Sequence, residues 1–209
     1  TSGPQPLLFR KPATPAVINN SKAVLPIALP RLCLGFGDLQ PGLEGEALLK
    51  HELCLEILLD ILYGTSSDFY VRHYESGLID AESFGCEIYV EPEFCFCLVG
   101  GDTPDPERLQ QEILGELERA TSTGRIERGF SRAARRAYGQ AVQNLDQVEG
   151  GVGALYSAIS RGAGPFGLFA EHRRLEAQDL RQCLECCLVP AHSGAAMIFP
   201  ARSQEGDGR

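Results

Sequence analysis

The chain has 209 residues, of which 44% are hydrophobic and 22% are charged, and its formal net charge is −9. This length and composition are typical of a globular protein with one large domain or two small ones. The acidic excess disfavours a phosphate-neutralising surface, so we expect no nucleic acid as a partner. No apolar run reaches the roughly eighteen residues that a membrane helix requires, so we also expect no membrane partner.

The two ends differ in composition from the rest of the chain. Residues 1–22 include prolines at positions 4, 6, 12 and 15, which predicts an extended lead-in or linker. We expect residues 23–200 to form the globular domain and residues 201–209 to form a polar tail. The start of the chain has neither an initiator Met nor the charged and apolar regions of a signal peptide. This start indicates a piece of a longer protein.

Apolar periodicity predicts strands and helices in a defined order. Residues 44–63 carry apolar side chains at helical spacing, broken only by acidic residues, which predicts a long amphipathic helix. In residues 93–101 both alternating faces are apolar, which predicts an interior strand. Pro26 and Pro30 place the start of the first strand at a sheet edge or a bulge.

In chain order, the expected elements are a strand at 31–36, helices at 44–63 and 66–76, strands at 83–91 and 93–101, helices at 103–121, 126–144, 146–160, 168–174 and 177–188, and a strand at 195–199. This order predicts an α+β fold, in which helices cover one face of a mixed or antiparallel sheet.

Eight cysteines raise the question of disulfides, but a chain this long and rich in apolar residues does not need them. Five of the eight lie inside apolar periodic segments: Cys33, Cys54, Cys86, Cys95 and Cys97. We interpret them as buried reduced thiols that act as small hydrophobic residues. Reduced thiols favour a cytoplasmic location.

The segment Cys183-Leu-Glu-Cys186-Cys187 has the C-x-x-C spacing of zinc and redox sites. A structural zinc site needs four ligands, and His192 is the only other nearby residue of a ligand type. Packing on one amphipathic helix is therefore the favoured interpretation, and we expect no metal ligands and no cofactor in this chain. A small zinc-binding module at the three cysteines stays open as an alternative.

Two short segments partly match zinc-peptidase motifs. His51-Glu52 would need a second His where Leu55 stands, and Glu171-His172 would need a first His where Leu168 stands. Both motifs need two imidazoles one helical turn apart to bind zinc from one face. One imidazole cannot do this, so we expect no catalytic residue in the chain.

Two other patterns carry little functional information. Gly100-Gly101-Asp102-Thr103 lacks the Lys of a phosphate-binding loop, and we expect its glycines to let a strand turn into a helix. Five arginines gather in one predicted helix, and a solvated face is the first interpretation, with a docking surface for an acidic neighbour as the alternative. These are Arg125, Arg128, Arg132, Arg135 and Arg136.

Taken together, residues from about 24 to 200 resemble the second, non-catalytic domain of the pitrilysin/insulinase family of zinc metallopeptidases, the inverzincins. The resemblance rests on five segments, which are 31–36, 53–63, Gly64-x-Ser66-Ser67, Gly77-Leu78-Ile79-Asp80 and 100–104. It implies a helix-covered mixed sheet in a bacterial processing-protease-like protein. In that family the first domain carries zinc in an H-x-x-E-H motif, which is absent from this chain.

The resemblance also implies partners and a role. The expected role is a non-catalytic C-terminal domain that helps to form a substrate chamber and a subunit interface. The expected partners are a peptide or protein substrate, the protein's own N-terminal zinc domain of roughly another two hundred residues, and a sister subunit. A catalytically silent assembly or scaffold domain is the alternative function, because one fold can serve both roles.

Many family members place an Arg and a Tyr after the short helix, where they help to hold substrate. The matching positions here are His73 and Asp80, so the pattern is not kept. We expect the helix at 66–76 to project His73 and Tyr74 toward a partner face or chamber, and these two residues with Asp80 are the site candidates. On the same helix we expect Asp68, Arg72 and Glu75 to be exposed and Phe69 and Val71 to flank the buried side.

Overall fold

A computed structural model describes residues 20–38, 42–122, 124–164 and 166–201 of the chain. Residues 1–19 of the lead-in expected at 1–22, and residues 202–209 of the polar tail expected at 201–209, lie outside the described residues. Within the described ranges, no helix is both long enough and apolar enough to span a lipid bilayer.

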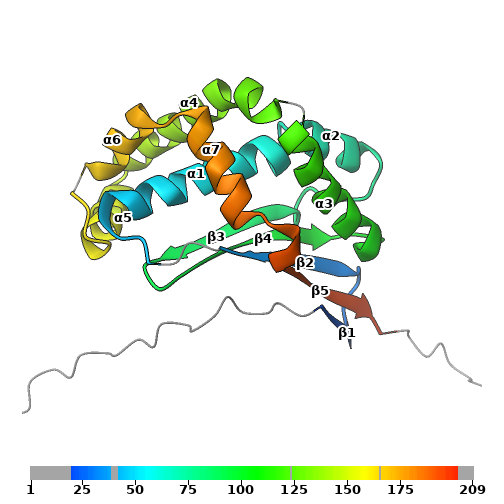
Figure 1. Cartoon of the computed structure of the whole chain (residues 1–209). Helices are drawn as coiled ribbons and strands as arrows, with labels where there is room; N and C mark the ends of the chain where they lie inside the picture. Colours follow the sequence, from blue (N-terminus) through cyan, green and yellow to red (C-terminus); the bar gives the residue numbers. More distant parts are fainter. Residues whose placement is uncertain (1–19, 39–41, 123, 165, 202–209) are drawn as a thin grey trace, which may run out of the picture.

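A five-stranded sheet forms one layer of the molecule, in the spatial order β1-β5-β2-β4-β3 (Figure 1). Only the β1/β5 pair is parallel, and the other three pairs are antiparallel. The strands are β1 (Ser21–Leu25), β2 (Arg31–Gly37), β3 (Gly85–Glu91), β4 (Phe94–Asp102) and β5 (Ser193–Pro200). The sheet is therefore mixed, as the sequence predicted.

All the helices lie on one side of this sheet (Figure 1). They are α1 (Gly45–Tyr63), α2 (Asp68–Glu75), α3 (Pro106–Ser122), α4 (Arg125–Leu145), α5 (Val148–Ser160), α6 (Gly167–Arg174) and α7 (Ala177–Cys187), with a short 3-10 helix at Pro190–His192. The prediction of an α+β fold with helices on one face is confirmed.

Helix α1 is the centre of the core. It packs on β3 on one side and contacts α4, α6 and α7 on others, so it is surrounded by protein. Most of its residues are buried, and Leu58 and Leu62 have no exposed surface. Its last residue, Tyr63, donates a hydrogen bond of 3.0 Å from its hydroxyl to the Ile113 carbonyl in α3. An element that is apolar on most of its surface is stable only in such a position.

Two expectations about the strands were wrong. Strand β1 was not predicted, and it begins at Ser21, inside the segment expected to be a lead-in. All five of its residues are exposed, so it carries no buried apolar pattern, and it is held by its parallel pairing with β5. Strand β2 is the middle strand of the sheet rather than an edge strand. Pro30 does not prevent this, because it comes just before the first residue of β2 and removes no hydrogen bond from the ladder.

The pair Gly100-Gly101 also differs from expectation, because both glycines lie inside β4 instead of forming a turn to the next helix. Backbone atoms of neighbouring segments lie very close to these two glycines. A Cβ atom on Gly101 would lie 2.6 Å from the Phe84 Cα, and one on Gly100 would lie 2.1 Å from the Leu32 carbonyl oxygen. These positions require glycine because any side chain would collide with backbone atoms.

Candidate functional site

Helix α2 begins at Asp68, two residues later than expected, and the Ser67 hydroxyl caps it by accepting a hydrogen bond of 3.0 Å from the Tyr70 N–H. The expected outward projection of His73 was wrong, because His73 is buried. It lies one turn after the fully buried Phe69, and the two rings pack with centroids 4.4 Å apart. Residues four apart on a helix share a face, so the position of Phe69 dictates that of His73.

The surroundings of His73 keep its imidazole neutral. Its Nε2 atom lies 3.5 Å from a Glu112 carboxylate oxygen of α3 but makes no hydrogen bond. Burial lowers the pKa of His73, and the Glu112 carboxylate only partly opposes this effect. In this position His73 contributes to the core between α2 and α3.

The three charged residues of α2 that were expected to be exposed are exposed, namely Asp68, Arg72 and Glu75. Apart from His73, the expectation for this helix fails only at Val71. Tyr74 is 54% exposed and lies beside Tyr70 in a stacked arrangement, so its outward position is confirmed. Val71 is 45% exposed, although we expected it to flank the buried side.

Asp80 forms part of a turn before β3. Its carboxylate accepts a hydrogen bond of 3.1 Å from the Ser83 N–H, and the Ser83 hydroxyl accepts one of 2.9 Å from the Asp102 N–H. The three site candidates thus have different surroundings: His73 is in the core, Tyr74 is at the surface, and Asp80 stabilises a turn. A role for them in binding substrate or a partner stays a prediction.

A buried carboxylate that was not predicted from the sequence connects three helices. The Glu116 side chain on α3 has no exposed surface and forms ion pairs with Arg125 of α4, Arg119 of α3 and Arg72 of α2. Arg125 also forms an ion pair of 2.7 Å with Asp68 at the start of α2. Arg125 was expected on a solvated face, but its side chain is mostly buried in this network.

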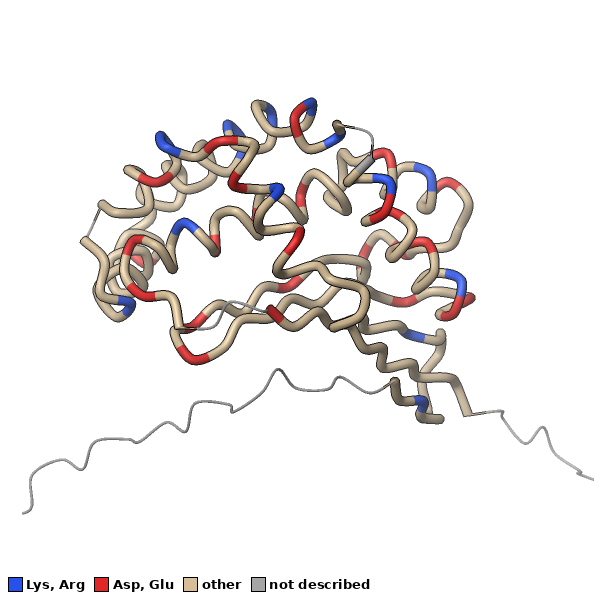
Figure 2. Tube along the Cα trace, viewed as in Figure 1, with Lys and Arg blue, Asp and Glu red and all other residues tan. Residues whose placement is uncertain are grey.

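Neither near match forms the two-imidazole zinc site of the peptidase motifs, because the partners of Glu52, Glu171 and His172 lie elsewhere. Glu52 pairs with Arg161. Glu171 is buried and accepts a hydrogen bond of 3.1 Å from Arg174. His172 packs edge-on against the Tyr138 ring, and burial lowers its pKa. Charged residues of both signs are interspersed along the helices (Figure 2).

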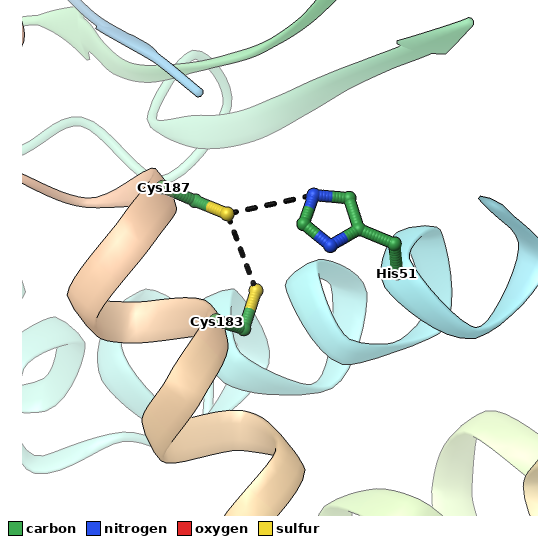
Figure 3. A group of neighbouring side chains, drawn as sticks. All are labelled: His51, Cys183 and Cys187. Carbon is green, nitrogen blue, oxygen red and sulfur yellow. Dashed lines mark hydrogen bonds between the residues drawn. The ribbon is translucent and has the colours of Figure 1, made fainter. Parts of the chain in front are cut away.

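The one described cluster that combines imidazole, thiol and carboxylate groups lies where α1, α7 and the end of β2 meet. Cys183 and Cys187 are one turn apart on α7, and both point toward His51 of α1 (Figure 3). The Cys183 and Cys187 sulfurs are 3.6 Å apart, and the Cys187 sulfur is 3.5 Å from His51 Nε2. The same Nε2 atom lies 2.5 Å from an Asp38 carboxylate oxygen. All four residues are buried.

This geometry is not that of a cysteine nucleophile. In a Cys-His-Asp arrangement the thiol and the carboxylate face different ring nitrogens, whereas here both face Nε2. The thiols also stay protonated. The pKa of Cys183 is raised to about 11, because burial and nearby charge outweigh a hydrogen bond to Cys187 that lowers it. The pKa of Cys187 is raised by its hydrogen bond with Cys183 and by burial.

A cavity of about 390 Å3 opens beside this cluster. His51, Cys183 and Cys186 line one part of it, and Lys50 and Asp179 line another, where they form an ion pair of 2.8 Å. The sequence indicated the cysteines but named His192 as the neighbouring ligand type. It could not reveal His51, which is 136 residues from Cys187 in the chain.

A stripe of exposed apolar side chains runs along α5. Its members recur at helical spacing and are Val148, Val152, Leu155, Tyr156 and Ile159, with exposures from 40% to 79%. Phe166, which follows this helix, is 70% exposed. A stripe of this kind on a surface helix usually marks a site of contact with another protein or domain.

Comparisons with known proteins give the architecture a family context. No family model matches the sequence. A protein of Bacillus subtilis strain 168 called uncharacterized zinc protease YmfH is 42% identical over 91 residues, which are 44% of this chain and 21% of that protein. The matched part of this chain therefore corresponds to about a fifth of the length of this relative.

Solved structures match over most of the chain. A protein from Alicyclobacillus acidocaldarius described as an M16-like peptidase has a TM-score of 0.80 and 25% identity, covering 87% of this chain and 44% of that one. The inactive peptidase domain of a zinc protease from Bordetella parapertussis has a TM-score of 0.67 and 17% identity, covering 88% of this chain and 99% of that one. The second match shows the fold alone.

The two matches differ in how much of the other chain they use. This chain covers less than half of the first, larger protein, but it covers nearly all of the second, which is a single inactive domain. The sequence match, the mixed sheet with its helical layer, and these likenesses agree with the expected family. The chain is similar to an M16-like peptidase in sequence and structure and to a zinc protease in part of its sequence, and it has the fold of the inactive peptidase domain of a zinc protease.

Proposed function

We propose that this chain is the non-catalytic domain of a zinc-dependent peptidase and that it packs against the catalytic zinc domain of the same protein. The apolar stripe on α5 carries the proposal, because it gives the domain a surface that needs a partner. The likeness to an inactive peptidase domain supports the non-catalytic role. The larger M16-like relative supports the presence of a second domain beside it.

The stripe suits a permanent contact between domains more than a transient one. Val148, Val152, Tyr156 and Ile159 are each more than half exposed, and α5 has a single charged residue, Glu149. Contacts that are always formed are more apolar than transient ones and exclude charge from their centre. We infer that the zinc domain covers this stripe and that the two domains together enclose a chamber for a peptide substrate.

The proposed division of work follows from the ligand chemistry. The sequence contains no H-x-x-E-H motif, and the near matches at His51 and His172 each supply one imidazole. Without a pair of imidazoles on one helix face, this motif cannot hold the zinc ion that activates water. The zinc for catalysis would then belong to the other domain. Tyr74, which is exposed, is the candidate here for contact with substrate or with a sister subunit.

The test uses a longer protein that contains both domains. In that protein Tyr156→Asp and Ile159→Asp should weaken the contact between the domains and lower the turnover of a quenched peptide at least tenfold. Leu29→Asp is the matched control, since Leu29 is 52% exposed but lies between β1 and β2, away from α5. Turnover in the stripe variants equal to that of Leu29→Asp would refute the proposed contact.

A cytoplasmic location is also part of the proposal. All eight cysteines are free, and reduced thiols persist in that compartment. The thiol content of the protein isolated from its native cells, measured without added reductant, tests this point. Disulfides in the isolated protein would contradict it.

A further inference from the structure

The buried cluster of Asp38, His51, Cys183 and Cys187 has the donor atoms of a metal site. Thiolate sulfur and imidazole nitrogen together are the ligands of structural zinc, and the carboxylate oxygen is a further ligand that zinc accepts. Among the described residues, three overlapping groups of mutually close donors are His51 with Cys183 and Cys187, Asp38 with His51 and Cys95, and Asp38 with Cys186 and Cys187. Within each group all ligand atoms lie within 4.8 Å of one another.

Two of the distances between these donors fit edges of one coordination tetrahedron. Bond lengths of about 2.3 Å to sulfur and about 2.0 Å to nitrogen imply edges of roughly 3.8 Å between sulfurs and roughly 3.5 Å between sulfur and nitrogen. The observed distances are 3.6 Å between the Cys183 and Cys187 sulfurs and 3.5 Å between the Cys187 sulfur and His51 Nε2. Three donors are therefore placed for a shared ion with little movement.

The fourth donor needs a small shift. Asp38 Oδ2 is 2.5 Å from His51 Nε2, within hydrogen-bond distance. A tetrahedral edge between nitrogen and oxygen is roughly 3.3 Å, so the carboxylate would move back by roughly 0.8 Å when an ion binds. Asp38 is the residue just after β2, and its backbone N–H donates a hydrogen bond of 3.0 Å to the Cys95 carbonyl of β4, so the shift would have to come from its side chain.

We propose that Asp38, His51, Cys183 and Cys187 bind one divalent cation of the zinc class. On binding, the two thiols lose their protons to solvent and become thiolates, while the His51 proton moves to Nδ1 so that Nε2 can donate its lone pair. Two protons are released for each ion bound, and no electron is transferred. The cavity beside His51 and Cys183 gives the ion a route from solvent to the site.

The ion would be structural. It would link α1, α7 and the end of β2, three elements that are far apart in the chain, and it would have no open position facing a substrate. This inference does not rest on the proposed peptidase function, because its ligands and its test lie within this chain. A disulfide between Cys183 and Cys187 is the competing state of the same two sulfurs.

The test begins with the chain reduced by a phosphine and stripped of metal by a chelator. Titration with Co2+ should saturate at one ion per chain, with the sulfur-to-cobalt charge-transfer band and the visible bands of a tetrahedral thiolate site, and Zn2+ should displace the cobalt. Cys183→Ala, Cys187→Ala and His51→Ala should each lose this spectrum. Cys97→Ala is the matched control, since Cys97 is an equally buried thiol that belongs to none of the close groups.

A second measurement covers variants that fail to fold. The midpoint of thermal unfolding of the unaltered chain should rise by about 5–10 °C at a hundredfold excess of Zn2+ over its dissociation constant. It should return to its starting value when chelator is added. The Cys97→Ala chain should show the same shift.

Three results would overturn the proposal. These are the absence of stoichiometric Co2+ or Zn2+ binding, a thiolate spectrum that survives both Cys183→Ala and Cys187→Ala, and a Cys183–Cys187 disulfide in protein isolated without reductant. Loss of the metal in Cys186→Ala together with its retention in Asp38→Asn would refute Asp38 as the fourth ligand.

Discussion

The Glu116 network offers a quantitative test of what holds α2, α3 and α4 together. Glu116 is a carboxylate with no exposed surface, and Arg125 is its strongest partner because the Arg125 side chain is only 17% exposed. Arg72 also contacts Glu116, at 3.5 Å, but its side chain is 52% exposed. The perturbation we choose is therefore Arg125→Met, which keeps much of the side-chain volume and removes the charge.

The expected loss follows from the cost of a buried charge without its partner. Removing one member of a buried ion pair costs about 3–5 kcal/mol. Arg119 still donates a hydrogen bond of 3.0 Å to Glu116, so we expect the low end of that range. For a chain of this length, about 3 kcal/mol lowers the unfolding midpoint by about 6–12 °C.

The assay is thermal and denaturant unfolding of four chains that form a double-mutant cycle: the unaltered chain, Arg125→Met, Glu116→Gln, and the double variant. We expect a coupling energy of about 1–3 kcal/mol between the two sites. Arg132→Met is the control, because Arg132 lies on the same helix but is exposed, and it should change the free energy of unfolding by less than about 0.5 kcal/mol. If Arg125→Met were as mild as Arg132→Met, or the coupling were zero, the reasoning would be refuted.

Two further predictions concern the core. The pKa of His73 is lowered in the folded state, so below its ordinary value of about 6.5 the unfolded chain binds more protons. The free energy of unfolding should therefore fall as the pH drops below about 6.5, and His73→Gln should make this fall shallower; an unchanged slope in titrated unfolding curves would contradict the burial argument. Leu58→Ala removes a side chain with no exposed surface at the centre of α1 and should lower the free energy of unfolding by about 2–5 kcal/mol, measured with urea. A loss below about 1 kcal/mol would show that the core closes around the gap.

The parts of the fold with strong periodic patterns could be predicted from the sequence. Helix α1 was expected at 44–63 and is found at Gly45–Tyr63, because its leucines repeat at helical spacing over five turns. The two edge strands, β1 and β3, differ in how strong a periodic pattern their sequences carry. β3 alternates between half-buried and exposed residues and was found, whereas β1 is exposed throughout and gave no pattern.

The positions of single side chains were harder to predict. His73 was expected to project outward because it is polar, yet the phase of α2 is set by Phe69, which places His73 in the core. The cluster around Cys187 was visible only as three cysteines on one helix. His51 joins the cluster because α1 packs against α7, and Asp38 joins it from the end of β2; both are far from the cysteines in the chain.

Hydrolysis of a quenched peptide tests most directly the claim that this is a non-catalytic domain of a zinc peptidase. The purified chain, supplied with Zn2+, should show no hydrolysis above the buffer rate, whether or not its thiol cluster binds the ion. The same chain combined with its zinc domain should hydrolyse the peptide, and a chelator should abolish that activity. Chelator-sensitive hydrolysis by this chain alone would contradict the claim.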